Sequence, residues 1–206
     1  MAHVISGRDL HAWKVANPHD ARLQKLTLTE LLENVDSHKV DYSSITYEGH
    51  PHELLLASSG WNCALGIGYV VFDCVCLFLG AAALRSSLTA EAAEDIAKAA
   101  EPVASQLEKY IKTMSAAESS KTEVAGAVFG IISTIYSGGC LGAVVSAFLG
   151  TLTWYNAMLY GATALGTIMA AVATDGAAEI GVIVVELATA GFLVEDSIKC
   201  ASACNY

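Results

Sequence analysis

The stretch SSKTEVAGAVFGIISTIYSGG, residues 119–139, decides the fold of this chain. Ser120 and Glu123 have the spacing of a capping box, in which each side chain accepts a hydrogen bond from a backbone N–H group of the other residue. From residue 124 to residue 174 the chain then carries no charge. A helix that is apolar all round must be covered all round, so this run is enclosed either by protein or by lipid.

The composition favours a chain with more apolar surface than an average soluble domain. Of the 206 residues, 54% are hydrophobic and 16% are charged, whereas about 25% charged residues are usual. The net charge of −10 excludes a nucleic-acid partner, because phosphate contacts need clustered Lys and Arg. The sequence shows neither the apolar run of a secretory signal peptide nor a lipidation motif, and we expect neither.

The N-terminal part is polar. Residues 1–53 contain all six histidines, and we expect an irregular head with one amphipathic helix. Asn17 is its predicted N-cap, with Pro18 at the first helical position. The apolar stripe of this helix consists of Leu23, Leu26, Leu31 and Val35.

The remainder, residues 54–206, predicts an all-α helical bundle with an uncharged central hairpin that is either embedded in a membrane or inserts into one. The predicted segments lie at about 61–84, 89–115, 124–147, 152–174 and 177–195. The hairpin results if the uncharged run divides near Gly150. A second possible division at residues 137–139 would instead give three shorter helices.

The segment 89–115 has the pattern of a solvated amphipathic helix. Thr89 is its predicted N-cap, and Pro102 predicts a kink or break within it. We expect the i,i+4 ion pairs Glu94–Lys98 and Glu108–Lys112 on its exposed face. Its apolar stripe consists of Ile96, Ala100, Val103, Leu107, Ile111 and Met114.

Small residues at four-residue spacing predict close helix packing. Small side chains on one face let two helix backbones approach each other, which is how helices associate in lipid. We therefore expect contacts within the hairpin, with other copies of the chain or with partners in a membrane complex. The residues concerned are Gly126, Gly130, Gly138, Gly142, Ala162, Gly166 and Ala170.

Three acids lie in apolar segments: Asp73, Glu179 and Glu186. An ionised carboxylate at the middle of a bilayer costs about 2.5–3.5 kcal/mol on insertion scales. These acids could line a water-filled path for cations or act as a pH-sensitive latch. Alternatively, they could cap neighbouring helices or face solvent in a soluble bundle.

We expect the cysteines at 63, 74, 76 and 140 to be reduced, because a buried thiol behaves as a small hydrophobic group. Cys200 and Cys204 could pair, carry a lipid or do neither, and we favour the inert state. The most metal-like group is His50, His52 and Glu53, but a zinc site needs three or four ligands with an ordered second shell. We expect no metal, no cofactor and no catalytic activity.

The organisation of the chain resembles that of pore-forming bacteriocin domains in its length, its amphipathic helices and its uncharged hairpin towards the C-terminus. The resemblance covers organisation only, and no residue is carried over from it. We expect a non-catalytic, membrane-inserting protein, pore-forming or permeabilising, that is soluble before it enters the bilayer. The alternatives are a constitutive multi-span membrane protein in a larger complex and a soluble all-α oligomeric scaffold.

Overall fold

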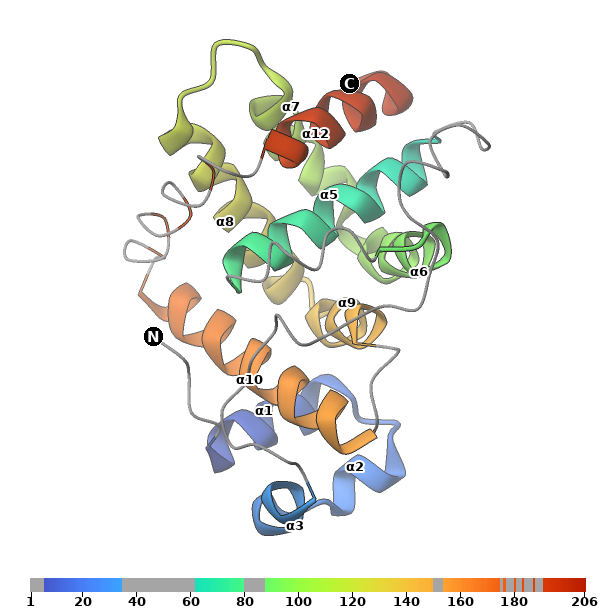
Figure 1. Ribbon diagram of the computed structural model, residues 1–206, viewed down its shortest axis with the longest axis vertical. Coiled ribbons are helices and arrows are strands. Elements are labelled where there is room, and N and C mark those ends of the chain that lie inside the picture. Colours follow the sequence, from blue (N-terminus) through green and yellow to red (C-terminus); the bar gives the residue numbers. More distant parts are fainter. Residues whose placement is uncertain are drawn as a thin grey trace.

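The computed structural model describes residues 6–34, 62–79, 88–149, 154–174 and 191–206, together with residues 176, 180, 183 and 187. Every element in these ranges is a helix, which confirms the all-α prediction. Figure 1 shows an elongated molecule with short helices at one end, and most of the longer helices packed around a central one at the other.

The central helix is α5 (Cys63–Phe78), and its residues 65–78 are all buried. Asn62 caps it by accepting a hydrogen bond from the N–H of Leu65. Among the described helices, those that pack most closely against it (Figure 1) are α6 (Ala90–Ala100), α8 (Lys121–Ser137) and α12 (Gly191–Cys204). The core of the bundle is therefore α5, which carries Asp73, and not a hairpin made from the uncharged run.

Two glycines allow α5 to lie between its neighbours. A Cβ atom on Gly68 would lie 1.9 Å from the carbonyl oxygen of Ala93 in α6. On the other side, a Cβ atom on Gly66 would lie 2.9 Å from the Cα atom of Cys200 in α12. Any larger side chain at either position would push a backbone away, so the sequence GIG fixes the packing of three helices.

The amphipathic segment folds largely as predicted. Thr89 caps α6, and the break at Pro102 is a 3-10 turn (Glu101–Val103) that leads into α7 (Ala104–Ser115). All six residues of the predicted apolar stripe are buried. The Glu108–Lys112 ion pair forms, but Lys98 pairs with Asp95 at 3.1 Å and not with Glu94.

The uncharged run forms three helices and not two. The capping box at Ser120 and Glu123 is present. However, the segment 124–147 is divided into α8 and α9 (Leu141–Phe148), which meet at an angle of 112°. Gly139 is the reason: it has a φ of 72°, and the N–H of Cys140 donates to the carbonyl of Ile135. This is the hydrogen bond of a Schellman motif, which ends a helix.

The third helix of the run is α10 (Trp154–Ala173). It packs against α8 and α9 on one side and against the N-terminal helices on the other (Figure 1). The predicted segment 177–195 falls mostly outside the described residues. At its end begins α12, a helix that the sequence analysis did not predict.

The N-terminal head is more regular than predicted. It contains α1 (Gly7–Ala16), α2 (Ala21–Lys25) and α3 (Leu28–Glu33). The prediction of a single helix with Asn17 as its N-cap was wrong. Asn17 instead follows the last residue of α1, and the N-cap of α2 is Asp20. The predicted leucines 23, 26 and 31 are buried, whereas Val35 lies outside the described residues.

Candidate functional site

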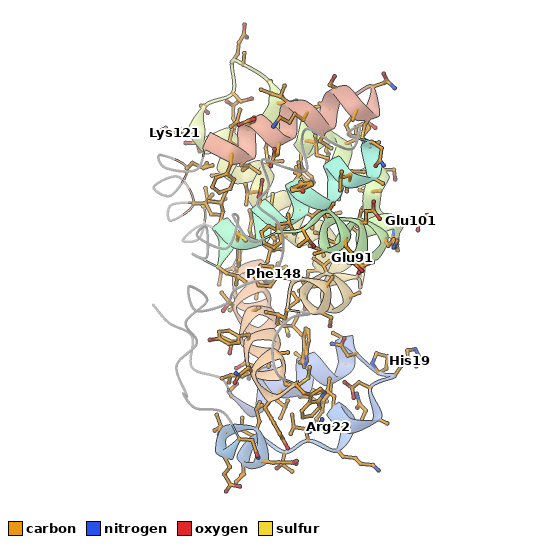
Figure 2. All side chains as sticks on the ribbon, turned by 45° about the vertical axis from the view of Figure 1, so that its right-hand side comes forward. His19, Arg22, Glu91, Glu101, Lys121 and Phe148 are labelled. Carbon is orange, nitrogen blue, oxygen red and sulfur yellow. A yellow bond between two sulfur atoms is a disulfide. The ribbon has the colours of Figure 1, made fainter. Side chains whose placement is uncertain are left out.

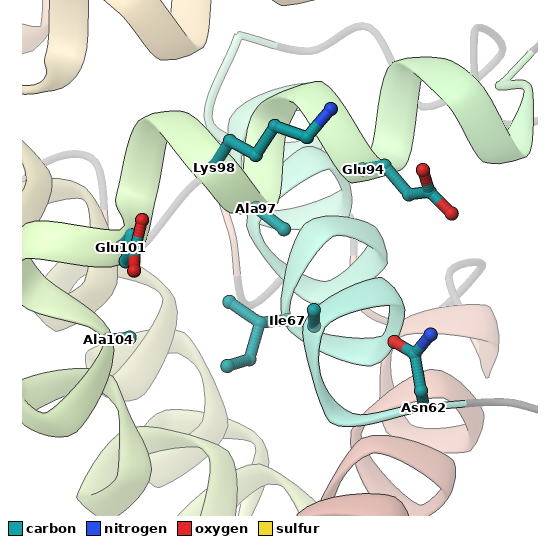
Figure 3. Close-up of a pocket in the computed structure, with 8 residues that line it drawn as sticks. Asn62, Ile67, Glu94, Ala97, Lys98, Glu101 and Ala104 are labelled. Atoms are coloured by element: carbon teal, nitrogen blue, oxygen red, sulfur yellow. The ribbon is translucent and has the colours of Figure 1, made fainter.

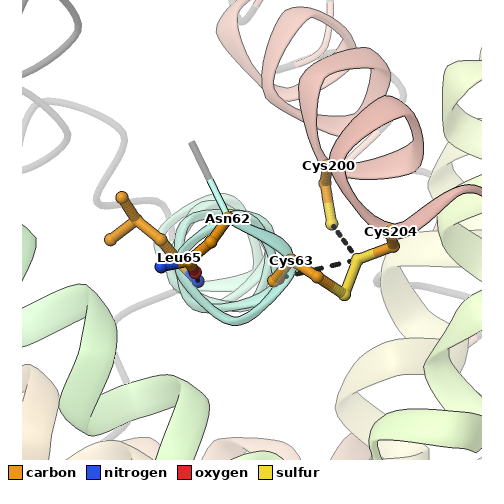
Figure 4. Close-up of a disulfide and its surroundings, with 5 residues drawn as sticks. All are labelled: Asn62, Cys63, Leu65, Cys200 and Cys204. Atoms are coloured by element: carbon orange, nitrogen blue, oxygen red, sulfur yellow. Dashed lines mark hydrogen bonds between the residues drawn. A yellow bond between two sulfur atoms is a disulfide. The ribbon is translucent and has the colours of Figure 1, made fainter. Parts of the chain in front are cut away.

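A disulfide joins the first residue of α5 to the last residue of α12. It links Cys63 to Cys204, which are 141 residues apart in the sequence and 4.5 Å apart between their Cα atoms (Figure 4). The prediction of a reduced Cys63 was therefore wrong, and Cys204 pairs with Cys63 and not with Cys200. Apolar context alone could not reveal this bond, because the partners meet only when α12 packs against α5.

A third cysteine lies beside this disulfide. The Cys200 sulfur is 3.9 Å from that of Cys204 (Figure 4), and its side chain is fully buried. Burial, together with the nearby carboxylate of Asp196, raises the pKa of Cys200 to about 12. Only a thiolate attacks a disulfide. Cys200 therefore stays protonated and does not undergo thiol–disulfide exchange with the neighbouring Cys63–Cys204 bond.

Of the three acids predicted to be functional, Asp73 lies within the described residues. Asp73 is fully buried in the middle of α5, where protein encloses it and no solvent reaches it. Its use as a pore-lining or pH-sensitive acid stays a prediction. Glu179 and Glu186 lie outside the described residues.

The predicted small residues fall into two groups. Three glycines lie at close contacts: Gly130 against the ring of Tyr110, Gly138 against Val103, and Gly142 against Ala16 at the end of α1. Ala162 and Gly166 are buried within α10. Gly126, by contrast, has no neighbour within 4 Å of an added Cβ atom, and Ala170 is exposed.

The contact between the head and α10 is centred on Trp13. This side chain is 1% exposed, and its indole N–H donates to the sulfur of Met158 over 3.2 Å. A Cβ atom on Gly161 would lie 2.6 Å from the Trp13 ring, so this glycine makes room for the indole. The sequence signal for α1 is the capping box of Ser6 and Asp9, which the sequence analysis missed.

Besides Trp13, side chains at the surface of the head contact the first turn of α10. The guanidinium of Arg22 lies 3.8 Å from the centre of the Trp154 ring and 5.3 Å from that of Tyr155. The hydroxyl of Tyr155 donates to the Glu30 carboxylate over 3.2 Å. Figure 2 shows Arg22 in the head, at the end of the molecule opposite Lys121. All three head helices therefore hold the start of α10.

The two halves of the molecule meet at Phe148 of α9, which is labelled near the middle of Figure 2. Its ring lies 5.2 Å from that of Phe72 in α5, measured between centroids. The half with the head contains α10, and the other half contains α5 and the disulfide. α10 is thus joined, through α8 and α9, to the part of the protein that the disulfide secures.

Among the described residues, α10 is the one helix long and apolar enough to cross a membrane by itself. The α8–α9 pair passes the same test only if its 112° bend is taken as part of one span, and α5 is shorter. Half of the apolar window in α10 is buried within the protein. Core helices of soluble proteins have the same properties, so length and hydropathy alone do not decide between a core and a membrane role.

An open cleft of about 360 Å³ lies between α5, α6 and α7 (Figure 3). Asn62 and Ile67 lie on one side, and Glu94, Lys98 and Glu101 on the other. The charged side chains lie at its border, and two of the three are acidic. We find no arrangement in this cleft of a nucleophile with a general base.

No group of three or more His, Cys, Asp or Glu side chains in the described ranges could hold a metal ion. The predicted candidates His50, His52 and Glu53 lie outside those ranges. No protein-family model, no curated protein and no solved structure matches this chain.

Proposed function

We propose that this protein folds in water and then inserts α10, together with the neighbouring uncharged helices, into a lipid bilayer, which it permeabilises without catalysis. The observation that carries the proposal is the position of α10 under the small N-terminal head. Its 20 residues correspond to about 30 Å of helix, which matches the hydrocarbon core of a bilayer. On the side away from α8 and α9, its cover consists of three helices of 10, 5 and 6 residues.

The head is the part of the fold that can separate at the lowest cost. Its contacts with α10 include the buried Trp13 and the exposed side chains of Arg22 and Glu30. An exposed cation–π contact contributes about 0.5–1 kcal/mol. α5, in contrast, is enclosed by several helices and secured by the disulfide. Local openings begin where the fewest buried contacts hold a segment, so the head opens before the bundle around α5 does.

Release of the head would leave the first half of α10 without its cover. Water would then meet an apolar surface, and burial of that surface in a bilayer becomes favourable at about 25 cal/mol per Å². Ala162 and Gly166 provide the small surface on which helices associate in lipid. The partners that we propose are therefore the bilayer and other copies of the chain.

A leakage assay with liposomes tests this proposal. Trp13→Ala removes the central contact of the head, whereas Leu107→Ala removes a fully buried side chain from α7, outside the head. Both substitutions should lower stability by about 2–5 kcal/mol. We expect Trp13→Ala to release an encapsulated dye about tenfold faster than Leu107→Ala does. Equal rates for the two variants would contradict release of the head as the first step.

The same preparations distinguish the alternative functions. A wild-type protein that stays in solution without detergent and lyses vesicles supports insertion from a soluble state. A protein that needs detergent throughout its purification supports a constitutive membrane subunit. A protein that is soluble and leaves vesicles intact, even as the Trp13→Ala variant, supports a soluble helical scaffold.

A further inference from the structure

A second and larger cleft lies where the head meets the uncharged helices. Its volume is about 660 Å³, and it is open to solvent. Ligand sites of proteins have volumes of about 300–1,000 Å³ and are mostly apolar with a few polar groups. The apolar part of this cleft is formed by α1, α9 and α10, through Ala12, Ala16, Leu141, Leu165 and Met169.

The charged residue that lines this cleft is a cation. Arg8 and His11 of α1 line it, and none of its lining residues is acidic. This is unusual for a chain with 21 Asp and Glu against 11 Lys and Arg. The cleft between α5, α6 and α7, by comparison, has two glutamates and one lysine. The larger cleft thus complements an anion, and the smaller one does not.

Neither the Arg8 side chain nor the His11 side chain serves the fold in an evident way. No hydrogen bond or ion pair joins Arg8 or His11 to another residue within the described part of the chain. Arg8 also lies in the first turn of α1, where the helix dipole disfavours a positive charge. Both residues are exposed beside the cleft, so both side chains are accessible to a ligand.

A further feature suits a ligand with an apolar tail. Val15 lines the cleft, and its side chain is 66% exposed. The cleft therefore offers apolar walls and an exposed apolar side chain on the same helix as Arg8.

We propose that this cleft binds a single-chain amphipathic anion of the fatty-acid class, with its carboxylate at Arg8 and His11 and its alkyl chain along Leu141, Leu165 and Met169. The side chain of Val15 would then cover part of the ligand's alkyl chain that otherwise faces water. Binding in solution does not require insertion into a bilayer, so this site and the proposed function can fail separately.

Isothermal titration with monomeric dodecanoate tests the site. We expect saturable binding of one molecule per chain, and binding at least about fivefold weaker for dodecan-1-ol, which has the same chain without the charge. Arg8→Gln should weaken dodecanoate binding about fivefold, and Ala12→Phe, which fills the cleft, should abolish it. Circular dichroism establishes that each variant remains folded.

The smaller cleft provides matched controls. Lys98→Gln and Ala104→Phe make the same two changes there and should leave dodecanoate binding unchanged. Three results would overturn the proposal: no saturable binding, equal losses in the control variants, or a loss with Ala12→Phe but none with Arg8→Gln. The last result would identify an apolar site that does not select an anion.

Discussion

Cys63 at the start of α5 is bonded to Cys204 at the end of α12, so the core helix and the C-terminal helix are covalently joined across most of the chain. A bond between residues 141 positions apart greatly restricts the unfolded chain, and disulfides that close such long loops contribute about 3–5 kcal/mol. We therefore predict that Cys63→Ala/Cys204→Ala lowers the free energy of unfolding in urea by that amount. Cys140→Ala, which removes a thiol outside the disulfide, is the control. Equal losses for the two variants would show that the bond itself contributes little.

The buried thiol of Cys200 predicts a loss of stability at alkaline pH. Its pKa rises from 9.0 to about 12 in the folded protein, mainly through burial and further through Asp196. The folded state thus holds the proton more tightly than the unfolded state does. The resulting stability is fully present below pH 9 and is lost, at about 1.4 kcal/mol per pH unit, as the pH rises towards 12.

Unfolding in urea at pH 8, 9, 10 and 11 measures this slope. Burial also raises the pKa of Tyr206, with smaller contributions from Cys200 and Glu108. The comparison is therefore made in a Tyr206→Phe background, with and without Cys200→Ala. The variant that retains Cys200 should lose stability more steeply above pH 9. Parallel slopes would mean that the Cys200 thiol is not protected from ionisation.

Two glycines of the uncharged run should respond oppositely to alanine. At Gly142 an added Cβ atom would lie 2.8 Å from the backbone oxygen of Ala16, so Gly142→Ala forces α9 away from α1. We expect a loss of about 1–3 kcal/mol. Gly126 has open space around it, and Gly126→Ala should stabilise α8 by up to about 1 kcal/mol. Thermal unfolding of both variants measures these changes in stability. A stabilised Gly142→Ala variant would refute the close approach of α1 and α9.

The cation–π contact of Arg22 with Trp154 should hold the head in place. Arg22→Gln removes the charge over the ring, and we expect amide exchange at the start of α10 to quicken by a factor that corresponds to about 0.5–1 kcal/mol. Lys25→Gln makes the same charge change on an exposed residue of α2. If both variants exchange at the same rate, the effect comes from net charge and not from the contact.

Several elements follow from local sequence. The capping box at Ser120 and Glu123, the cap at Thr89 and the break at Pro102 all form as predicted. These features depend on residues within one turn of each other, so their energetics are already present in a short peptide. The stripe from Ile96 to Met114 is likewise a property of helical spacing.

Other elements were decided by competing local signals. The uncharged run follows the predicted division into three helices, because the positive φ of Gly139 and the Cys140–Ile135 hydrogen bond end α8. The pair predicted between Glu94 and Lys98 is replaced by Asp95–Lys98. Both alternatives have similar local energies, so small differences in packing decide between them.

The sequence by itself determined that this protein is helical and that its charge-poor segments must be enclosed, because helical periodicity, caps and apolar composition act over a few residues. Only the tertiary structure decided that α5 is the core, that Trp13 covers α10, and that Cys63 pairs with Cys204. Each of these relations joins residues far apart in the chain. They depend on which helix faces fit together at close range, for example where Gly66 and Gly161 make room for Cys200 and Trp13.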